Sequence, residues 1–336
     1  MTRHRLAAAT QWITPAVHRH GADLVAHVME CQALSRRRAR KLLAALVDAR
    51  WLERDGSPRR PVYRAGPMRQ VVQRYALAGL QEDLPWARDF APLLDLPPPV
   101  ARLAQHAFTE LLNNAIDHSG GSGVTVSVRQ NATHLQMLVS DDGCGLFERI
   151  EQSFAIGDPT LAMLELSKGK LSSQPERHCG QGLFYVARLA DVFELHANRQ
   201  AFQHRGWGRA GWHAGRPMPH TGTSVFLAIA LDTPRTLDAV LRAHSVQGGY
   251  GFDATQVPLR LLTGPQVGLE SRAQARRAVA RLAAFRRAEL DFSGIEDIGP
   301  AFADELLRVF ARANPAVELR PVALAPRVKA MLDAVA

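Results

Sequence analysis

The chain has 336 residues, of which 46% are hydrophobic, and a formal net charge of +9. This composition fits two or three domains with apolar cores, excludes a disordered chain, and favours an anionic partner, whether nucleic acid or nucleotide. No run is apolar enough to span a membrane, basic residues interrupt the N-terminus, and three widely spaced cysteines argue against a disulfide framework, so we expect a cytoplasmic protein with no membrane partner.

A basic helix is predicted near the N-terminus. It starts at Ser35, a suitable N-cap, and carries Arg36, Arg37, Arg38, Arg40 and Lys41 opposite Leu42, Leu43 and Leu46. An apolar segment, 24–29, precedes it, and a turn at Trp51 and the loop 56–63 follow. Helix, turn, basic helix and hairpin form the pattern of bacterial winged helix-turn-helix domains, which residues 1–68 resemble.

In such a domain the basic helix enters the major groove of DNA and the wing contacts phosphates. We therefore predict double-stranded DNA as a partner. The predicted contact residues are Arg36, Arg37, Arg40, Lys41, Arg59 and Arg60. Winged helices also dock proteins, and arginine-rich helices are often only solvated, so a regulatory protein partner stays open.

A polar stripe lies on the predicted helix 108–119. Glu110, Asn114 and Asp117 recur at helical spacing on an otherwise apolar segment. Polar groups that are buried need partners, and a phosphate-bound Mg²⁺ with its waters would supply them. The alternative is a solvated helix face.

Two predicted strands, 124–128 and 135–139, are joined by a turn at 131–133 and lead to Asp141. A carboxylate at this strand end can accept a hydrogen bond from an adenine amino group. Gly143 and Gly145 follow, and residues without a side chain let the backbone turn tightly against a planar base. Taken alone, Asp-Asp-Gly is often only a turn.

Gly180, Gln181 and Gly182 immediately precede the apolar run that starts at Leu183, so the glycines fall at a helix N-terminus. Free backbone amides at such an end attract phosphate, although an ordinary glycine-rich helix start has the same pattern. Further along, Thr223 opens the apolar strand 224–231.

Together these motifs resemble the four boxes of the GHKL superfamily, which includes the DNA gyrase B subunit, MutL, histidine kinases and anti-sigma-factor kinases. The resemblance implies a Bergerat-fold α/β sandwich over residues 69–235 that binds ATP and Mg²⁺. It makes Glu110 the catalytic base, Asn114 the Mg²⁺ ligand and Asp141 the reader of adenine. The remaining ATP-binding residues that it implies are Asp117, Gly143, Gly145, Gly180, Gln181, Gly182, Leu183 and Thr223. Segment 154–179 matches the ATP lid, in which Lys168 and Lys170 are candidates for phosphate contact, although exposed lysines are usually only solvated.

From residue 257 onward, short apolar runs alternate with helical ones, which predicts an α/β layer over residues 250–336. Residues 290–306 resemble the STAS-like domain of unknown function that is fused to such ATPases. True STAS anti-anti-sigma factors carry a phosphorylatable serine at a place that Gly299, Pro300 and Ala301 occupy here. We therefore expect a docking or signal-coupling platform, with Asp304 and Glu305 as solvated or capping-type residues near the N-terminal turn of a helix.

The sequence thus predicts an α+β protein with three domains. The favoured function is an ATP-binding regulator, a Mg²⁺-dependent ATPase whose nucleotide state controls DNA or protein binding. A serine/threonine protein kinase of the anti-sigma type, acting on a separate protein, and a nucleotide-sensing adaptor without turnover both stay open. A gyrase-like homodimer also stays open.

Overall fold

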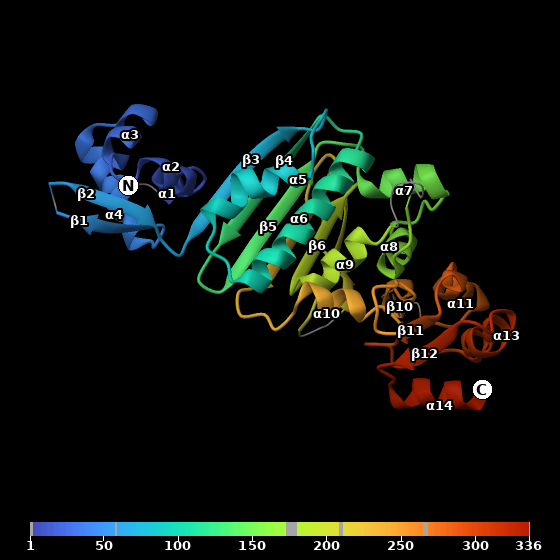
Figure 1. Cartoon of the computed structure of the whole chain (residues 1–336). Coiled ribbons are helices and arrows are strands. Elements are labelled where there is room, and N and C mark those ends of the chain that lie inside the picture. The colour runs from blue at the N-terminus through green and yellow to red at the C-terminus, as the bar shows by residue number, and fades with distance from the viewer. Residues whose placement is uncertain (1–2, 58, 173–179, 208–210, 265–267, 336) are drawn as a thin grey trace.

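The structure is a computed structural model that describes residues 3–57, 59–172, 180–207, 211–264 and 268–335. It mixes helices and strands in three units that follow one another along the chain (Figure 1). Within the described ranges, no helix combines the length and the apolar character needed to cross a lipid bilayer.

The N-terminal unit packs four helices against a two-stranded antiparallel hairpin. Its elements are α1 (Arg3–Thr10), α2 (Ile13–His20), α3 (Leu24–Cys31), α4 (Arg36–Asp48), β1 (Leu52–Gly56) and β2 (Pro61–Ala65). Helix α4 buries Ala39, Leu42, Leu43 and Leu46. These side chains belong to an apolar cluster of the N-terminal unit that is separate from the core of the rest of the chain.

The central unit is a seven-stranded antiparallel sheet in the order β3-β4-β5-β9-β6-β7-β8. Its strands are β3 (Arg69–Ala76), β4 (Gly123–Gln130), β5 (His134–Asp141), β6 (Val192–Ala197), β7 (Gln200–Arg205), β8 (Gly211–Ala214) and β9 (Thr223–Ala230). In β5 every second residue is buried, as expected for a strand covered more heavily on one face. The alternation places Asp141, the last residue of β5, among the buried ones.

Helices cover one face of this sheet. The longest is α6 (Pro98–His118), which packs against α9 (Gly182–Leu189) and contacts β5 and β9 (Figure 1). Segment 236–249, which the sequence assigned to no domain, contains α10 (Leu237–Arg242), and this helix packs on α6 and α9. The remaining central helices are α5 (Asp83–Pro85), η1 (Trp86–Phe90), η2 (Ala91–Leu93), α7 (Leu146–Phe154) and α8 (Pro159–Lys168).

The C-terminal unit is built on a three-stranded parallel sheet in the order β10-β11-β12. Its elements are β10 (Ala254–Pro258), η3 (Leu259–Leu262), α11 (Arg272–Val279), η4 (Leu282–Ala284), β11 (Arg287–Asp291), α12 (Pro300–Asp304), η5 (Glu305–Phe310), α13 (Ala311–Ala313), β12 (Glu318–Val322) and α14 (Pro326–Val335). The buried side chains of the central and C-terminal units form one continuous apolar cluster. The C-terminal unit therefore packs firmly on the central one.

One corner of the contact between these two units is aromatic and contains a histidine. The His244 ring lies 4.6 Å edge-on from the ring of Phe184 in α9 and 6.3 Å from that of Phe252, which precedes β10. Burial, together with the nearby charge of Arg188, lowers the pKa of His244 to about 3. The imidazole is therefore neutral in the folded protein at ordinary pH.

We expect acid to weaken this packing. As the pH falls from 6.5 to about 3, the unfolded chain takes up a proton that the folded His244 does not, so stability is lost across this window. His244→Phe keeps the ring contacts and removes the titration, and should reduce the acid-induced loss of stability by at least about 1 kcal/mol. Thermal unfolding from pH 7 to pH 4 measures the effect, with the exposed His18→Phe as the control. An equal fall in Tm for both variants and the wild type would contradict this role of His244.

Candidate functional site

A cavity of about 380 Å³ lies between α6, the first turn of α9 and the ends of β5 and β9. This volume is in the range of small-molecule sites. The predicted residues that line the cavity are Glu110, Asn114, Asp141, Gly145, Gly180, Gln181, Gly182, Leu183 and Thr223. Asp117, on α6, and Gly143 are not among the lining residues, and the Gly143 backbone N–H donates to Asp141.

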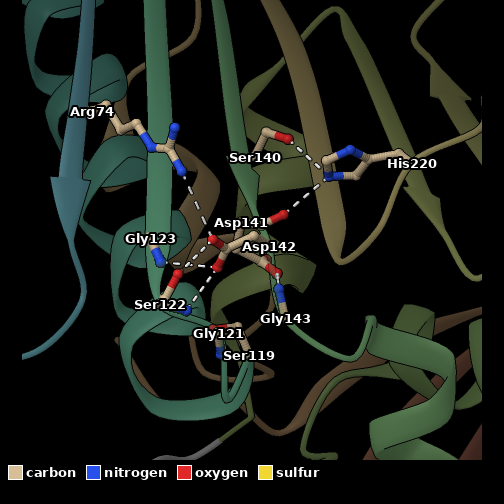
Figure 2. Close-up of polar contacts among 10 residues, drawn as sticks. All are labelled: Arg74, Ser119, Gly121, Ser122, Gly123, Ser140, Asp141, Asp142, Gly143 and His220. Atoms are coloured by element: carbon tan, nitrogen blue, oxygen red, sulfur yellow. Dashed lines mark hydrogen bonds and ion pairs between the residues drawn. The ribbon is translucent and has the colours of Figure 1, made fainter.

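Asp141 is a buried carboxylate at the end of β5, with 7% of its surface exposed. The backbone N–H of Gly143 donates a hydrogen bond of 2.9 Å to its Oδ1 (Figure 2). The backbone N–H of Thr223 donates a second one, of 3.1 Å, to the same oxygen. Burial raises the pKa of Asp141, and the two backbone hydrogen bonds oppose that rise. The carboxylate thus joins the first glycine turn to the start of β9. Because both hydrogen bonds reach Oδ1, Oδ2 remains available to accept a hydrogen bond from a ligand.

The neighbouring Asp142 has a different task. Its oxygens accept from the backbone N–H groups of Ser122 and Gly123, at 2.7 and 2.8 Å, and from the Ser122 hydroxyl at 2.8 Å (Figure 2). These hydrogen bonds lower the pKa of Asp142. Asp142 therefore fastens the segment between α6 and β4 and lies outside the cavity lining.

Two glycines after β5 permit close approaches that side chains would block. A Cβ at Gly143 would overlap the carbonyl of Ser119 at the C-terminal end of α6. Gly145 has φ +89°, in the left-handed region, and a Cβ there would overlap the side chain of Asn198. Asn198 in turn accepts at Oδ1 from the backbone N–H of Phe147, in the first turn of α7. These contacts hold the loop between β5 and α7 against the end of α6, at the edge of the cavity.

Glu110 stands opposite the N-terminus of α9. A Cβ at Gly182 would overlap Oε2 of Glu110, so the missing side chain lets the carboxylate reach the first turn of α9. His106 lies one helical turn before Glu110 and also lines the cavity. Its Nε2 is buried without a hydrogen-bond partner among the described residues. Burial lowers the pKa of His106, and the Glu110 charge partly offsets that effect.

The Asn114 amide also lines the cavity, and its Nδ2 is buried without a hydrogen-bond partner in the described chain. An amide whose polar atoms are not used by the protein is ready for a ligand, and its oxygen is a hard donor of the kind Mg²⁺ takes together with phosphate and water. Asn114 therefore fits a phosphate-bound Mg²⁺. The described residues hold no cluster of three His, Cys, Asp or Glu side chains arranged for a metal.

Lys168 and Lys170, the candidates for phosphate contact, are not among the residues that line this cavity. The ammonium groups of both donate to backbone carbonyls of the C-terminal unit instead. The cavity is lined by a different basic group, Arg149 of α7, whose Nε donates to the carbonyl of His118 at 2.8 Å. Neither Arg149 nor His106 was predicted from the sequence. The helical spacing before Glu110 is a signal for His106, whereas no motif marks Arg149.

The six predicted DNA-contacting residues are exposed on α4 and on the loop between β1 and β2. Four of them, Arg36, Arg40, Arg59 and Arg60, surround a groove of about 890 Å³ whose floor includes Val25, Met29 and Leu34. Arg37 and Lys41 lie on α4 outside the groove lining. Ser35 precedes the helix as expected, but its side chain makes no capping hydrogen bond.

Two family models match the chain. Residues 100–233 match the family described as histidine kinase-, DNA gyrase B-, and HSP90-like ATPase, and residues 274–329 match the STAS-like domain of unknown function (DUF4325). A search of curated proteins found no match. The first match runs from α6 to the end of β9 and includes every predicted ATP-site residue, and the second runs from α11 into α14. The chain therefore carries an ATP-binding domain of the GHKL type, followed by a STAS-like domain.

Proposed function

We propose that this protein is an ATP-dependent regulator that hydrolyses ATP in the cavity between α6 and α9. The observation that carries the proposal is the placement of Asp141, Glu110 and the first turn of α9 around one cavity of suitable size. These groups offer an acceptor for adenine, a general base and free backbone amides for phosphate.

At the adenine end, Asp141 accepts a hydrogen bond from the exocyclic amino group. With Oδ1 held by two backbone amides, Oδ2 makes this bond, and the charge on the carboxylate strengthens it. The hydrophobic neighbours Val139, Leu146, Ile150 and Val225 line the same cavity and exclude water from the base.

At the phosphate end, the free N–H groups of the first turn of α9 bind phosphate oxygens, since helix N-termini carry partial positive charge. Asn114 would hold Mg²⁺, which would supply neutralisation of the phosphate charge. Glu110, pressed against this turn, orients the attacking water and accepts its proton. Arg149 adds a positive charge at the cavity wall.

The same site suits two other outcomes. A serine/threonine hydroxyl of a separate protein can take the place of water, which makes the chain a kinase, and ATP bound without turnover makes it a sensor. Incubation of the pure protein with labelled ATP and Mg²⁺ separates the three. Label released as free phosphate supports hydrolysis, label on protein supports the kinase, and intact ATP supports the sensor.

Asp141→Asn should weaken ATP binding at least tenfold. The amide oxygen of asparagine still accepts from Gly143 and Thr223, which directs the amide N–H₂ toward the adenine amino group, where a donor meets a donor. Calorimetry with ATP and Mg²⁺ measures the affinity. Asp142→Asn is the matched control, because Asp142 lies outside the cavity lining, and it should bind ATP like the wild type. Equal affinity of both variants would remove Asp141 from the site.

Glu110→Ala and Glu110→Gln should bind ATP yet lose hydrolysis by about 10²-fold or more, since a general base typically contributes 10²- to 10⁴-fold. The phosphate cradle at α9 is unchanged in both variants. Release of labelled phosphate under single-turnover conditions gives the rate. Glu148→Gln, an exposed carboxylate on α7, is the control. Hydrolysis at the wild-type rate by folded Glu110→Gln would exclude Glu110 as the base.

A second function, DNA binding by the N-terminal unit, is favoured by one specific observation. Arg36 and Arg40 of α4 and Arg59 and Arg60 of the β1–β2 loop border the same groove, so two separate elements present positive charge to one surface. The recognition helix and wing of a winged-helix protein contact duplex DNA with these two elements. We propose that ATP occupancy and DNA binding are two activities of one regulator.

Changing Arg36, Arg37 and Arg40 to alanine together should weaken duplex DNA binding and lower the slope of log affinity against log salt by about 2–3, because each phosphate contact contributes about 0.9. ATP affinity should stay unchanged. Fluorescence anisotropy at several salt concentrations tests this. Arg312, Arg327 and Lys329, all exposed in the C-terminal unit, give a control variant with the same loss of charge. If wild-type protein shows no salt-sensitive DNA binding with or without ATP, the unit serves protein docking instead.

A further inference from the structure

The segment 165–171, here called the strap, contacts the nucleotide cavity on one side and the STAS-like domain on the other. Leu166 and Leu171 line the cavity. Glu165 and Lys168 are buried, with only 7% and 1% of their surfaces exposed, and lie where α8 packs against β10 and η3 of the STAS-like domain. One short segment thus belongs to both surfaces.

Lys168 is the centre of the contact with the STAS-like domain. Its Nζ donates to Glu165 Oε1 at 2.6 Å and to the carbonyls of Ala280 and Arg277 at 3.0 and 3.2 Å. These two carbonyls lie at the C-terminal end of α11, where helix carbonyls lack intrahelical partners and carry partial negative charge. The ammonium group of the strap therefore caps a helix of the other domain. Burial lowers the pKa of Lys168, and the Glu165 carboxylate opposes that shift.

The STAS-like domain returns contacts to the strap. The Thr255 hydroxyl, in β10, donates to the Lys168 carbonyl at 2.6 Å, and the Arg281 guanidinium donates to the Lys170 carbonyl at 3.2 Å. Arg281 Nε also lies 3.8 Å from Glu165 Oε2. The strap and the STAS-like domain thus each donate hydrogen bonds to the other, and these contacts involve several residues of the strap.

Lys170 connects this contact to the phosphate end of the cavity. Its side chain donates to the carbonyl of Ala284 at 2.6 Å and lies 4.2 Å from the ring centre of Phe285. Its backbone N–H donates to the carbonyl of Gly180 at 2.9 Å. Gly180 lines the cavity directly before α9. A single residue therefore bridges η4 of the STAS-like domain and the glycine turn that faces phosphate.

We propose that the STAS-like domain is an intramolecular ligand of the strap, and that its docking through Lys168 and Lys170 is thermodynamically coupled to nucleotide binding. In the docked state the strap supplies Leu166 and Leu171 to the cavity wall and holds Gly180 there through the Lys170 backbone N–H, so docking favours nucleotide. Linkage then requires that nucleotide strengthens docking by the same factor. This coupling rests on the proposed function, because it concerns the same ATP site.

The coupling is tested by hydrogen–deuterium exchange on the full chain with Mg²⁺ and a non-hydrolysable ATP analogue. Residues 272–284 include no cavity-lining residue, so protection there reports docking alone. The analogue should slow exchange in residues 272–284 of the wild type. The double variant Glu165→Gln/Lys168→Met removes both buried charges without leaving either one unpaired. It should bind the analogue about fivefold more weakly or worse, lose the protection of 272–284, and exchange faster there even without nucleotide.

Thr255→Val provides a second, milder variant from the STAS-like side, with an effect in the same direction. The control is Glu151→Gln/Lys329→Met, the same chemical change at exposed positions, which should behave like the wild type. If the wild type binds the analogue but 272–284 exchange unchanged, or if the double variant keeps both affinity and protection, the coupling is refuted. If the wild type binds no analogue, the proposed function fails, and the exchange difference without nucleotide still decides whether Lys168 docks the domain.

Discussion

The site depends first on one desolvated carboxylate. Asp141 ends a buried strand, and its Oδ1 holds the backbone amides of Gly143 and Thr223. Without these two donors a carboxylate so deeply buried would be too costly to keep ionised. The same two bonds fix the turn that presses against α6 and the start of β9. The shape of the cavity and the charge inside it therefore have a common cause.

A second constraint is the close approach of α6 to the loops around it. Gly143 lets one loop approach the end of α6, and Gly182 brings the first turn of α9 against Glu110. A methyl group at either position would push the elements apart. The two loops to which we assign base recognition and phosphate binding are thus positioned by the same helix, α6.

The sequence could predict the part of this site whose chemistry is local. A polar stripe at helical spacing, a carboxylate at a strand end and glycines before a helix each carry their own pattern, and nine of the residues predicted from them line the cavity. Asp117 shares the pattern of α6 but lies outside that lining, whereas its neighbour His118 lines the cavity, so helical spacing alone does not decide which residues reach it. Arg149 could not be found, since only the fold brings α7 to the cavity.

The contacts between segments far apart in the sequence were the least predictable. Lys168 and Lys170 look like solvated lysines beside a phosphate site, and Glu305 like a solvated residue at a helix start. In the structure Lys168 is buried against carbonyls more than 100 positions away in sequence, and Glu305 is buried with its Oε1 at 2.8 Å from Arg276. These partners of Lys168 and Glu305 come from distant segments of the chain, so no local sequence pattern indicates that these two charges are neutralised.

The two apolar clusters also set the order in which the parts of the chain can fold during synthesis. The N-terminal unit has a core of its own, so it can fold as soon as β2 has left the ribosome. The ATP-binding domain shares its core with the STAS-like domain, and α11, which Lys168 caps, is made more than 100 residues after Lys168 itself. Until that helix emerges, the ammonium group and the apolar surface around it stay in water, and the finished wall of the nucleotide cavity is among the last parts of the molecule to form.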